Sequence, residues 1–537
     1  MRQISLVAFL QAQNCTTIPA AWRHPEGWTN SYSPEYYQHI GRVLEEGKFD
    51  MGFFDDRLAM PDMYMGDHAH TVEHGIRCVK MDPVTCMTVM AMATKHLGLG
   101  ATMSTTYFNP FHVARLFQTV DLMTHGRAAW NVVTSVNDNE ARNWGWEKGL
   151  EHDYRYDRAD EFLEIVRGHW DSWDDDAVLY DKVNMKFADP DKIRRLDYKG
   201  KYYSSRGPFT VPRSPQGNPV LIQAGSSGRG MKFGSRWGEV IFTAWHNLGM
   251  AQQQYKAMKE DCAAFGRNPD HFKLCNLFYP MVAATRMEAE DKKAFYDTLP
   301  NEIDQLSLLS EALNYDFGQK GIDEPFTDEE LEGITGMQAM RDRVVKTAGI
   351  KNPTPRDFME VTGRGRMNDP WVGTGKDIAD KMEEYFTSDA CDGFVVGPTW
   401  LPGSFEDFVK YVVPEIQKRG LYRKEYPGTT LRETPGAHGN NTYRPASSRR
   451  TVSAAAGAPR GGRSTARPFR RARNQPHSAR TLQSAVGPLA EATCQTHRRQ
   501  TLIRVSGYQD RRHRMERHYR NHRHQSSHRQ SSRRPIR

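Results

Sequence analysis

Cysteine is scarce in this sequence, and no part of it is long and apolar enough to cross a membrane. Only seven cysteines occur in 537 residues, and none has the CxxC or Cys/His spacing of a zinc site. So few cysteines in so long a chain predict no disulfide framework and favour a reducing, cytoplasmic compartment. No run of about 18 apolar residues occurs, so no transmembrane helix is expected. Glutamines interrupt the N-terminal apolar run, which therefore predicts a strand and not a signal peptide.

Several motifs of well-known enzyme classes are also missing. The sequence has no HExxH motif, which leaves a zinc hydrolase without support, and we expect no metal site. It has no GxSxG elbow of an α/β-hydrolase and no Walker motif of a P-loop protein. No GxGxxG follows the first expected strand, which disfavours a doubly wound dinucleotide-binding sheet.

Lysine is absent from the last hundred residues, which differ sharply from the rest. Residues 437–537 contain 23 arginines and three acids, a net charge of +20. Residues 1–436 then hold 50 basic and 62 acidic residues, a net charge of −12. The basic segment has no hydrophobic periodicity, which predicts a folded domain over 1–436 and a disordered tail over 437–537. Its composition favours an extension without function over a nucleic-acid-binding arm.

Short apolar or β-branched segments alternate with helical patterns along residues 1–436. This alternation predicts an α/β fold, a (β/α)8 TIM barrel, with a doubly wound open sheet as the alternative. The spacing leaves room for insertions after strand 4, with a small hairpin in 171–218, and after strand 7, with extra helices in 284–392. The second insertion is a candidate lid, with plain scaffolding as the alternative. The eight expected strands are 4–10, 51–57, 97–104, 128–135, 219–225, 239–245, 274–283 and 393–399.

Polar residues lie towards the ends of several of these strands, where barrel enzymes place their active sites. Asp56 lies at the end of the second strand, Thr102 near the end of the third, and Asn131 in the fourth. The fifth strand runs into QAGSSGRG (223–230), whose glycines, hydroxyls, backbone N–H groups and arginine could form a nest for a phosphate.

A histidine and a tyrosine four residues apart would share one helix face and could both hydrogen-bond a ligand. They are His152 and Tyr156, although a simple surface pair would have the same spacing. Aromatic residues near the strand ends would suit a planar heterocycle or an apolar substrate, or would belong to the core. They are Tyr107, Phe108, Trp130, Trp144, Trp146 and Trp245.

Several long segments of the chain occur in the order typical of one family. They include EEGKFDMGFFDDRLA (45–59), LGLGATMSTTYFNPFHVAR (97–115), GRAAWNVVTSVNDNEARNWG (126–145), HDYRYDRADEF (152–162), VPRSPQGNPVLIQAGSSGRG (211–230) and DGFVVGPTWLPGSFEDF (392–408). On these segments the chain resembles the flavin-dependent component of two-component monooxygenases of the bacterial luciferase-like superfamily, in the branch of nitrilotriacetate monooxygenase component A and dibenzothiophene-sulfone monooxygenase. The resemblance covers about residues 3–434.

The resemblance implies a cofactor and the residues that hold it. The cofactor would be FMN, used as FMNH2 and supplied by a separate NAD(P)H:flavin reductase. Asp56 and Thr102 would line the isoalloxazine pocket, and Asn131 would reach the polar edge of the ring. The ribityl chain and phosphate would be held by His152, Tyr156, Ser226 and Ser227. Relatives often carry uncharged residues where this chain has Asp55 and Arg57 beside Asp56, which concerns the substrate side of the site.

The resemblance also implies a reaction and an assembly. O2 would react to give a C4a-(hydro)peroxyflavin, and the protein would exclude water and position a small organic substrate. The aromatic strand ends favour an aromatic or organosulfur or organohalogen substrate over an aminopolycarboxylate. His152 is a candidate hydrogen-bond donor in catalysis. The family implies a homodimer or homotetramer. A deazaflavin-dependent oxidoreductase on the same barrel is the enzymatic alternative, and nucleic-acid binding through the tail is the non-enzymatic one.

Overall fold

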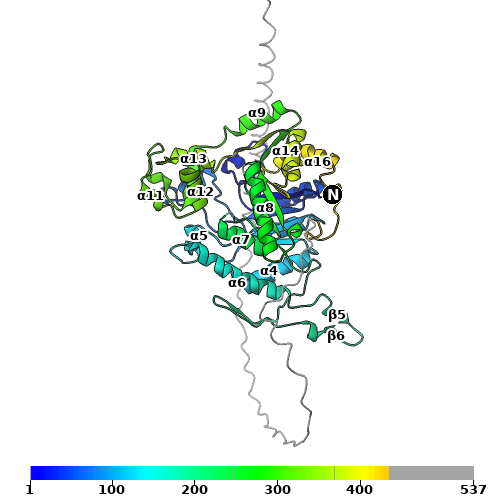
Figure 1. Cartoon of the computed structure of the whole chain (residues 1–537). Helices are drawn as coiled ribbons and strands as arrows, with labels where there is room; N and C mark the ends of the chain where they lie inside the picture. Colours follow the sequence, from blue (N-terminus) through cyan, green and yellow to red (C-terminus); the bar gives the residue numbers. More distant parts are fainter. Residues whose placement is uncertain (1, 226, 246, 368, 435–537) are drawn as a thin grey trace, which may run out of the picture. The chain divides into compact units, whose positions relative to one another are not determined.

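A closed barrel of eight parallel strands forms the centre of the protein in a computed structural model, which describes residues 2–434 except 226, 246 and 368 (Figure 1). Around the barrel the strand order is β1-β14-β11-β10-β9-β4-β3-β2. The predicted TIM barrel is therefore confirmed, and each predicted strand segment overlaps one barrel strand. The barrel strands are β1 (Ser5–Gln11), β2 (Met51–Asp55), β3 (Gly98–Ser104), β4 (Ala128–Val133), β9 (Val220–Gln223), β10 (Val240–Thr243), β11 (Lys273–Phe278) and β14 (Gly393–Val396).

One predicted strand needs correction. The segment 274–283 was expected to be a single strand, but it divides into β11 and β12 (Pro280–Ala283). Proline has no N–H group for the sheet ladder, which explains the break at Pro280. Beyond it, β12 leaves the barrel and pairs in parallel with β13 (Trp371–Thr374).

Helices cover the outside of the barrel, and side-chain caps fix where several of them begin. The Asn109 side chain accepts a hydrogen bond from the Phe111 N–H at 2.9 Å, with Pro110 in the first helical turn. This is a favourable helix start, because proline has no N–H to leave unpaired there. The covering helices are α1 (Pro34–Glu46), α3 (Pro83–Ala91), α4 (Pro110–Met123), α6 (His152–Trp170), α7 (Gly228–Trp237), α8 (Leu248–Ala264), α14 (Gly375–Thr387), α15 (Gly403–Asp407), the π-helical η7 (Phe408–Val412) and α16 (Val413–Lys418).

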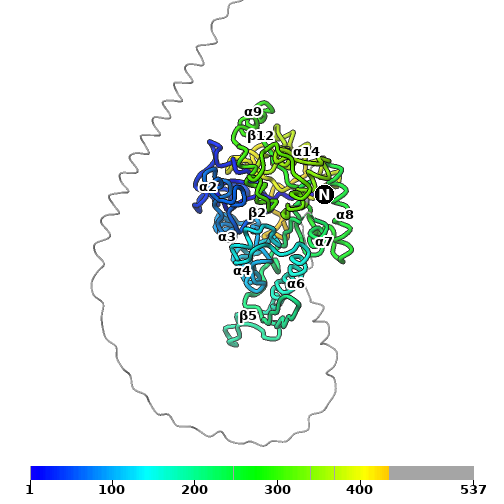
Figure 2. Tube along the Cα trace, turned by 90° about the vertical axis from the view of Figure 1, so that its left-hand side faces the viewer, coloured from blue at the N-terminus to red at the C-terminus, as the bar shows by residue number. Residues whose placement is uncertain are grey.

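Two insertions enlarge the barrel where the sequence predicted them. After β4, α5 (Asp138–Asn143) precedes α6, and two antiparallel hairpins follow it. They pair β5 (Val178–Asp181) with β6 (Lys186–Ala188) and β7 (Tyr198–Lys199) with β8 (Ser204–Ser205). The β5–β6 hairpin projects away from the barrel in both views (Figures 1 and 2).

The insertion after β11 has a hydrophobic core of its own. Phe317, Phe326 and Phe358 pack edge to face, with ring centroids 5.4–5.5 Å apart. Its helices α11–α13 lie together beside the barrel (Figure 1). The elements are α9 (Arg286–Tyr296), α10 (Glu302–Leu313), η5 (Phe317–Gln319), α11 (Asp328–Glu332), α12 (Gln338–Asp342), η6 (Arg343–Thr347) and α13 (Pro355–Thr362). Short helices elsewhere are η1 (Pro19–Arg23), η2 (Tyr64–Gly66), α2 (Ala69–His74), η3 (Pro190–Lys192) and η4 (Pro269–His271).

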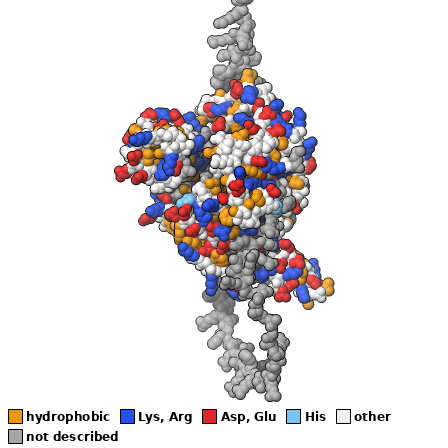
Figure 3. Space-filling view, viewed as in Figure 1, with side chains coloured by type: hydrophobic (Ala, Val, Ile, Leu, Met, Phe, Trp, Pro, Cys, Tyr) orange, Lys and Arg blue, Asp and Glu red, His pale blue; other side chains and the backbone are white. Residues whose placement is uncertain are grey.

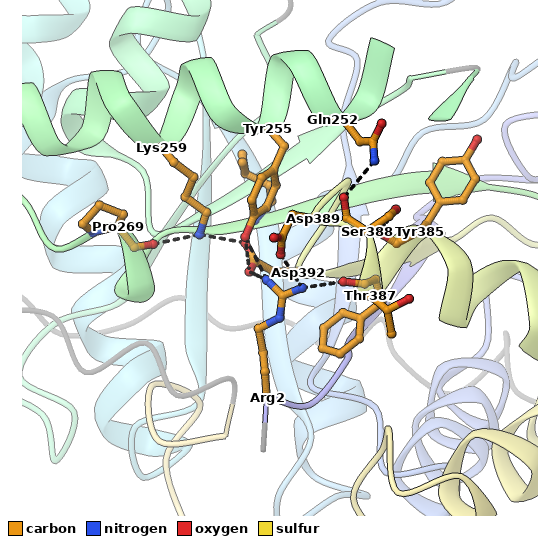
Figure 4. Close-up of polar contacts among 12 residues, drawn as sticks. Arg2, Gln252, Tyr255, Lys259, Pro269, Tyr385, Thr387, Ser388, Asp389 and Asp392 are labelled. Carbon is orange, nitrogen blue, oxygen red and sulfur yellow. Dashed lines mark hydrogen bonds and ion pairs between the residues drawn. The ribbon is translucent and has the colours of Figure 1, made fainter. Parts of the chain in front are cut away.

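Buried aspartates close the end of the barrel at which the strands begin. Asp392 precedes β14 and accepts a hydrogen bond from the Leu274 N–H at 3.0 Å, while Lys259 lies 2.9 Å away (Figure 4). Asp50, before β2, accepts from the Leu6 N–H at 2.6 Å and pairs with a buried arginine, Arg423, at 2.8 Å. These carboxylates satisfy backbone donors and cations that burial would otherwise leave unpaired.

The last described segment also closes this end. Leu431 is buried with the side chains of the barrel interior, and its N–H donates to the Gly126 carbonyl at 2.9 Å. The fold therefore uses the chain up to Thr434. The predicted domain boundary and the tail at 437–537 lie outside the described residues, and they stay predictions.

The described surface carries charges of both signs. Basic and acidic side chains are interspersed over the face shown in Figure 3. Within the described ranges, no helix is both long and apolar enough to span a membrane. The six described cysteines are free thiols, as expected of a chain without a disulfide framework.

Candidate functional site

The ends of four neighbouring strands form a ring of inward-facing polar side chains. Val7, Met51 and Ala129 belong to the barrel interior, and side chains on one face of a strand recur every second residue. Gln11 and Asp55 lie four residues beyond Val7 and Met51, and Asn131 lies two residues beyond Ala129. These three polar side chains therefore also face the barrel interior. Thr102 joins them from β3, because a Cβ at Gly100 would lie 2.9 Å from Ile222 in the interior. The ring consists of Gln11, Asp55, Thr102 and Asn131.

Aromatic side chains form an apolar floor below this ring. The rings of Phe9 and Phe53 are stacked with centroids 5.6 Å apart, and the ring centroid of Phe242 lies 4.6 Å from that of Phe53. All three pack with the barrel interior. A planar ligand entering from the strand ends would meet an apolar surface below it and polar groups around its edge.

Asn131 is the member of the ring best placed to bind a ligand. Its Nδ2 donates to Thr102 Oγ1 at 2.9 Å, and Thr102 Oγ1 donates to the Phe54 carbonyl at 2.9 Å. These bonds fix the orientation of the amide. Its Oδ1 is buried and has no hydrogen-bond partner among the described residues, and neither amide atom of Gln11 has one. A buried acceptor without a partner is costly, which points to a ligand donor at this position.

A cavity of about 430 Å³ opens beside the ring. Thr102 connects it to the ring, and Lys80 lies on its wall with Nζ 3.7 Å from Asp55 Oδ1. Lys80 Nζ makes no hydrogen bond to the described residues, so it is available to a ligand. The cavity residues include Asp56–Met60, Cys78, Lys80–Val84, Thr102, Met103, Phe108 and Asn143.

Asp56 is a carboxyl group with altered acidity on this cavity. Burial raises the pKa of Asp56 to about 7, and nearby Lys80 partly opposes that rise while Asp55 adds to it. Asp56 Oδ1 accepts a hydrogen bond from the Arg57 N–H at 2.8 Å. The group can thus gain or lose a proton near neutral pH, as functional carboxyls in clefts often do.

The N-termini of two helices meet at a second site. Ser227 caps α7, and its Oγ accepts from the Gly230 N–H at 3.0 Å. His152 begins α6, and its Nε2 lies 3.2 Å from Ser227 Oγ. The rings of His152 and Tyr156 lie 5.2 Å apart on the same helix face, as their spacing predicted. Helix N-termini present free N–H groups and positive dipole ends, which favour a bound anion.

Glycines make room for backbone to approach this second site. A Cβ at Gly230 would lie 2.7 Å from Tyr156 Oη, and one at Gly225 would lie 3.1 Å from it. Tyr156 is buried, so its hydroxyl is held against the strand-to-helix turn. We call the set of His152, Tyr156, Gly225, Ser227 and Gly230 the phosphate cradle.

A comparison with known families decides the class of the protein. The model of the family described as luciferase-like monooxygenase matches residues 18–390. The chain belongs to the luciferase-like monooxygenase family. The match covers the barrel from the loop after β1 almost to β14, so it includes the phosphate cradle and every member of the polar ring except Gln11.

Individual relatives of this luciferase-like monooxygenase agree. The chain is 42% identical over 446 residues to the dibenzothiophene-sulfone monooxygenase of Rhodococcus erythropolis, with 81% of this chain and 97% of that protein covered. It is 38% identical over 427 residues to nitrilotriacetate monooxygenase component A of Aminobacter aminovorans, with 77% and 92% covered. The crystal structure of a riboflavin lyase with modified FMN and riboflavin is similar with a TM-score of 0.74 and 30% identity, with 82% and 97% covered. The predicted family, fold and enzyme class are confirmed.

The residues of this monooxygenase fit a flavin nucleotide. The free Oδ1 of Asn131 would suit a donor on the polar edge of the ring, and the phosphate cradle would suit a terminal phosphate. The close approach at Gly225 and Gly230 leaves no space for side chains where a ligand would meet the backbone.

The structure groups most of the predicted site residues. Asp56, Thr102 and Asn131 lie at the ring and cavity, while His152, Tyr156 and Ser227 lie in the cradle. Ser226 lies outside the described residues, so its role stays a prediction. His152 also bonds Asp153 at 2.7 Å and its side chain is 44% exposed, which places it at the rim.

The structure decides one open alternative and corrects one expectation. Trp130 and Trp245 belong to the packed core and do not line the cavity: Trp130 is fully buried and donates to the Met103 carbonyl at 3.0 Å, and Trp245 packs against a cluster that includes side chains of β10 and α8. Trp130 faces the covering helices from β4, and Trp245 follows the end of β10. Arg229 was expected in the anion nest, but it pairs with Asp160 at 2.6 Å. A helical position turns it towards α6.

Sequence reasoning missed the residues that come from loops. Lys80 lies in a loop without periodicity, so nothing in its neighbourhood marked it as part of the site. The same holds for Asn137, whose Oδ1 accepts from Arg57 at 2.5 Å and whose Nδ2 donates to the Glu311 carbonyl at 2.9 Å. Asn137 thereby joins the cavity rim to α10, so the predicted lid insertion does border the site.

Proposed function

We propose that this protein is the large oxygenase component of an FMNH2-dependent two-component monooxygenase. The observation that carries the proposal is the phosphate cradle at one side of the barrel mouth, combined with the unpartnered Asn131 amide oxygen inside it. One part suits a phosphate and the other the edge of a flavin ring. The similarity to a riboflavin lyase solved with a modified FMN supports the choice of flavin.

The described residues would bind and orient this cofactor. Tyr156 and Ser227 would hold the phosphate through their hydroxyls, with His152 at the rim. Asn131, fixed by Thr102, would bind the edge of the ring, which would lie above Phe9, Phe53 and Phe242. Bound FMNH2 would supply the activation of O2, which no side chain can provide.

The cavity would hold the substrate and keep water away from the reacting atoms. Its wall combines Phe108, Met103 and Met60 with the charged groups Asp56 and Lys80. Apolar walls limit water, which protects a reactive oxygen species from wasteful decay. Asp56 would exchange a proton with the substrate side, since its pKa lies near 7.

The aromatic residues beside the cavity support a substrate class. Phe108 lines the cavity and meets Trp144 edge to face, with ring centroids 5.9 Å apart, and Trp144 stacks on Tyr107 with centroids 4.7 Å apart. Aromatic surroundings of this kind suit an aromatic or organosulfur compound better than a polycarboxylate. The relative named for dibenzothiophene sulfone supports this choice.

The proposal includes a partner and an assembly. FMNH2 would come from a separate NAD(P)H:FMN reductase, and the relative named component A supports a two-component system. We also propose a homodimer or homotetramer in the cytoplasm. Sedimentation of the purified chain would measure the assembly.

Binding of reduced cofactors under anaerobic conditions tests the proposal. We expect saturable binding of FMNH2, and O2 uptake with NADH, FMN, a flavin reductase and an organosulfur substrate. Binding no stronger than that of serum albumin would contradict it, and preference for a reduced deazaflavin would favour the alternative oxidoreductase.

A pair of cap variants makes this test specific. Ser227→Gly removes the cradle hydroxyl and keeps a residue tolerated at a helix start. Ser33→Gly makes the same change at the cap of α1. We expect weaker FMNH2 binding in the first variant and unchanged binding in the second.

A further inference from the structure

Three potential metal ligands gather on the short helix α2. They are His70, Glu73 and His74, and one ligand atom of each lies within 4.8 Å of the others. Positions i, i+3 and i+4 of a helix share one face, and two histidines at i and i+4 are a known arrangement for metal binding. We propose that α2 forms a binding site for a divalent transition-metal ion, which we call the α2 site.

The side chains of the α2 site are free to take a ligand. Within the described part of the chain, none of the three makes a side-chain hydrogen bond or an ion pair. The described contact of His70 is the Tyr64 ring, 5.5 Å between centroids. Histidines beside a carboxylate would normally pair with it, so three groups that converge without pairing leave a space for a cation between them.

Ligand chemistry identifies the ion. Two imidazoles and one carboxylate suit Zn²⁺, Cu²⁺ or Ni²⁺ better than Mg²⁺ or Ca²⁺, which prefer oxygen ligands. Tetrahedral Zn²⁺ with bonds of about 2.0–2.1 Å needs ligand atoms about 3.3 Å apart, which rotation of the exposed Glu73 and the two partly exposed histidines can provide. Water would complete the coordination, since the described residues supply three ligands.

The sequence pattern hides this site. The order is HxxEH, the reverse of the HExxH motif whose absence led us to expect no metal. The proposal replaces that expectation. None of the three residues is among those lining the cavity, so the ion would not take part in the proposed oxygenation.

The surroundings of α2 indicate what an ion would do there. The His74 carbonyl accepts hydrogen bonds from Trp22 Nε1 at 2.9 Å and from Arg23 at 3.0 Å. Arg23 also binds both oxygens of Asp304 in α10, at 2.6 and 2.9 Å. Gly75 ends α2 with φ of 67°, directly against the Trp22 ring.

An ion at the α2 site would therefore brace the barrel rim. α2 belongs to the loop after β2, Arg23 to the loop after β1, and Asp304 to the insertion that borders the cavity. Six residues are too short for a helix that is stable alone, and a cross-link between two of its turns would hold it helical. The bound ion would thus favour one arrangement of the rim.

Metal titration of the full chain tests the proposal. Residues 437–537 contain eight further histidines, so the binding must be read as a difference between variants. We expect His70→Ala/His74→Ala to bind one Cu²⁺ or Zn²⁺ fewer than the unaltered chain by calorimetry. His68→Ala, which removes an exposed neighbour paired with Asp67, should bind the same number as the unaltered chain.

Two further readouts keep the test decisive. Cu²⁺ at the α2 site should give an electron paramagnetic resonance spectrum with two imidazole nitrogens, lost in the double variant. Glu73→Gln, an exposed change that leaves the fold intact, should weaken binding at least about tenfold. Equal stoichiometry in all variants, or Glu73→Gln binding as tightly as the unaltered chain, would overturn the proposal.

Discussion

The two ends of the barrel use similar polar residues in opposite ways. Where the strands begin, Asp392 and Asp50 accept hydrogen bonds from backbone N–H groups and pair with the partly buried Lys259 and the buried Arg423. Where the strands end, Asn131 Oδ1 and both amide atoms of Gln11 are buried and have no partner among the described residues. Satisfied polar groups stabilise a fold, whereas unsatisfied ones cost free energy unless a ligand meets them. The first end thus stabilises the barrel, and the second is where we propose that the cofactor binds.

Removing a carboxylate from the closed end should give the largest effect. Asp50→Ala leaves the Arg423 guanidinium buried without its partner, so we expect the free energy of unfolding to fall by about 3–5 kcal/mol. Urea titration measures it. Asp50→Ala/Arg423→Met should recover part of the loss. A decrease below about 1 kcal/mol in the single variant would contradict the role given to this end.

Removing a hydroxyl from the open end should affect binding more than stability. Tyr156→Phe deletes a donor to the proposed phosphate, and a hydrogen bond to a charged group contributes about 1.5–3 kcal/mol. We expect FMNH2 to bind roughly 10–150-fold more weakly by anaerobic fluorescence titration.

The matched control is a tyrosine at the closed end. Tyr426 donates to the Phe49 carbonyl at 2.9 Å, so Tyr426→Phe should cost about 1 kcal/mol of stability. Its FMNH2 affinity should stay unchanged. Equal affinities in the two variants would show that Tyr156 does not hold the cofactor.

A buried carboxyl group at each end of the barrel should change the stability of the protein over a different pH range. Burial raises the pKa of Asp56 to about 7, above its value in an unfolded chain of about 3.9. A raised pKa means that the folded protein favours the protonated carboxyl group. The contribution of Asp56 to the free energy of unfolding is therefore complete below about pH 4 and is lost as pH rises to about 7. Comparing thermal midpoints of Asp56→Asn and the unaltered chain from pH 4 to 8 measures it.

Asp121, at the closed end, provides the comparison. Burial raises its pKa to about 6, while hydrogen bonds from Ser214 and the Ala128 N–H oppose the rise. The stability contributed by protonated Asp121 should therefore be lost about one pH unit lower than that contributed by Asp56. Asp121→Asn should also lower stability at every pH, because it disturbs those bonds. A flat difference for Asp56→Asn would reject its raised pKa.

The smallest effect is expected at the rim. Trp144 is 37% exposed and stacks on Tyr107, so Trp144→Ala removes an aromatic contact of about 0.5–1.5 kcal/mol. We expect KM for an aromatic substrate to rise up to roughly tenfold, with FMNH2 affinity unchanged. A change in kcat alone would place Trp144 away from the substrate.

Much of the fold could be predicted from the sequence because the barrel signal is local. Each predicted strand segment overlaps a barrel strand, and His152 and Tyr156 share the expected helix face. Elsewhere a single residue or an orientation decided the outcome. Pro280 ended a strand within an apolar run, and the outward orientation of Trp130 decided that it belongs to the core and not to the cavity.

The sequence by itself determined the alternation of strands and helices, the family, and the residue types of the cradle. Periodicity and motifs carry that information along the chain. Only the tertiary structure decided which groups meet. It brought Lys80 to the cavity, joined Asn137 to α10, and left Asn131 Oδ1 without a partner in the part of the chain that the structure describes. Such contacts join residues far apart in the chain, so they depend on how the barrel closes and not on any local pattern.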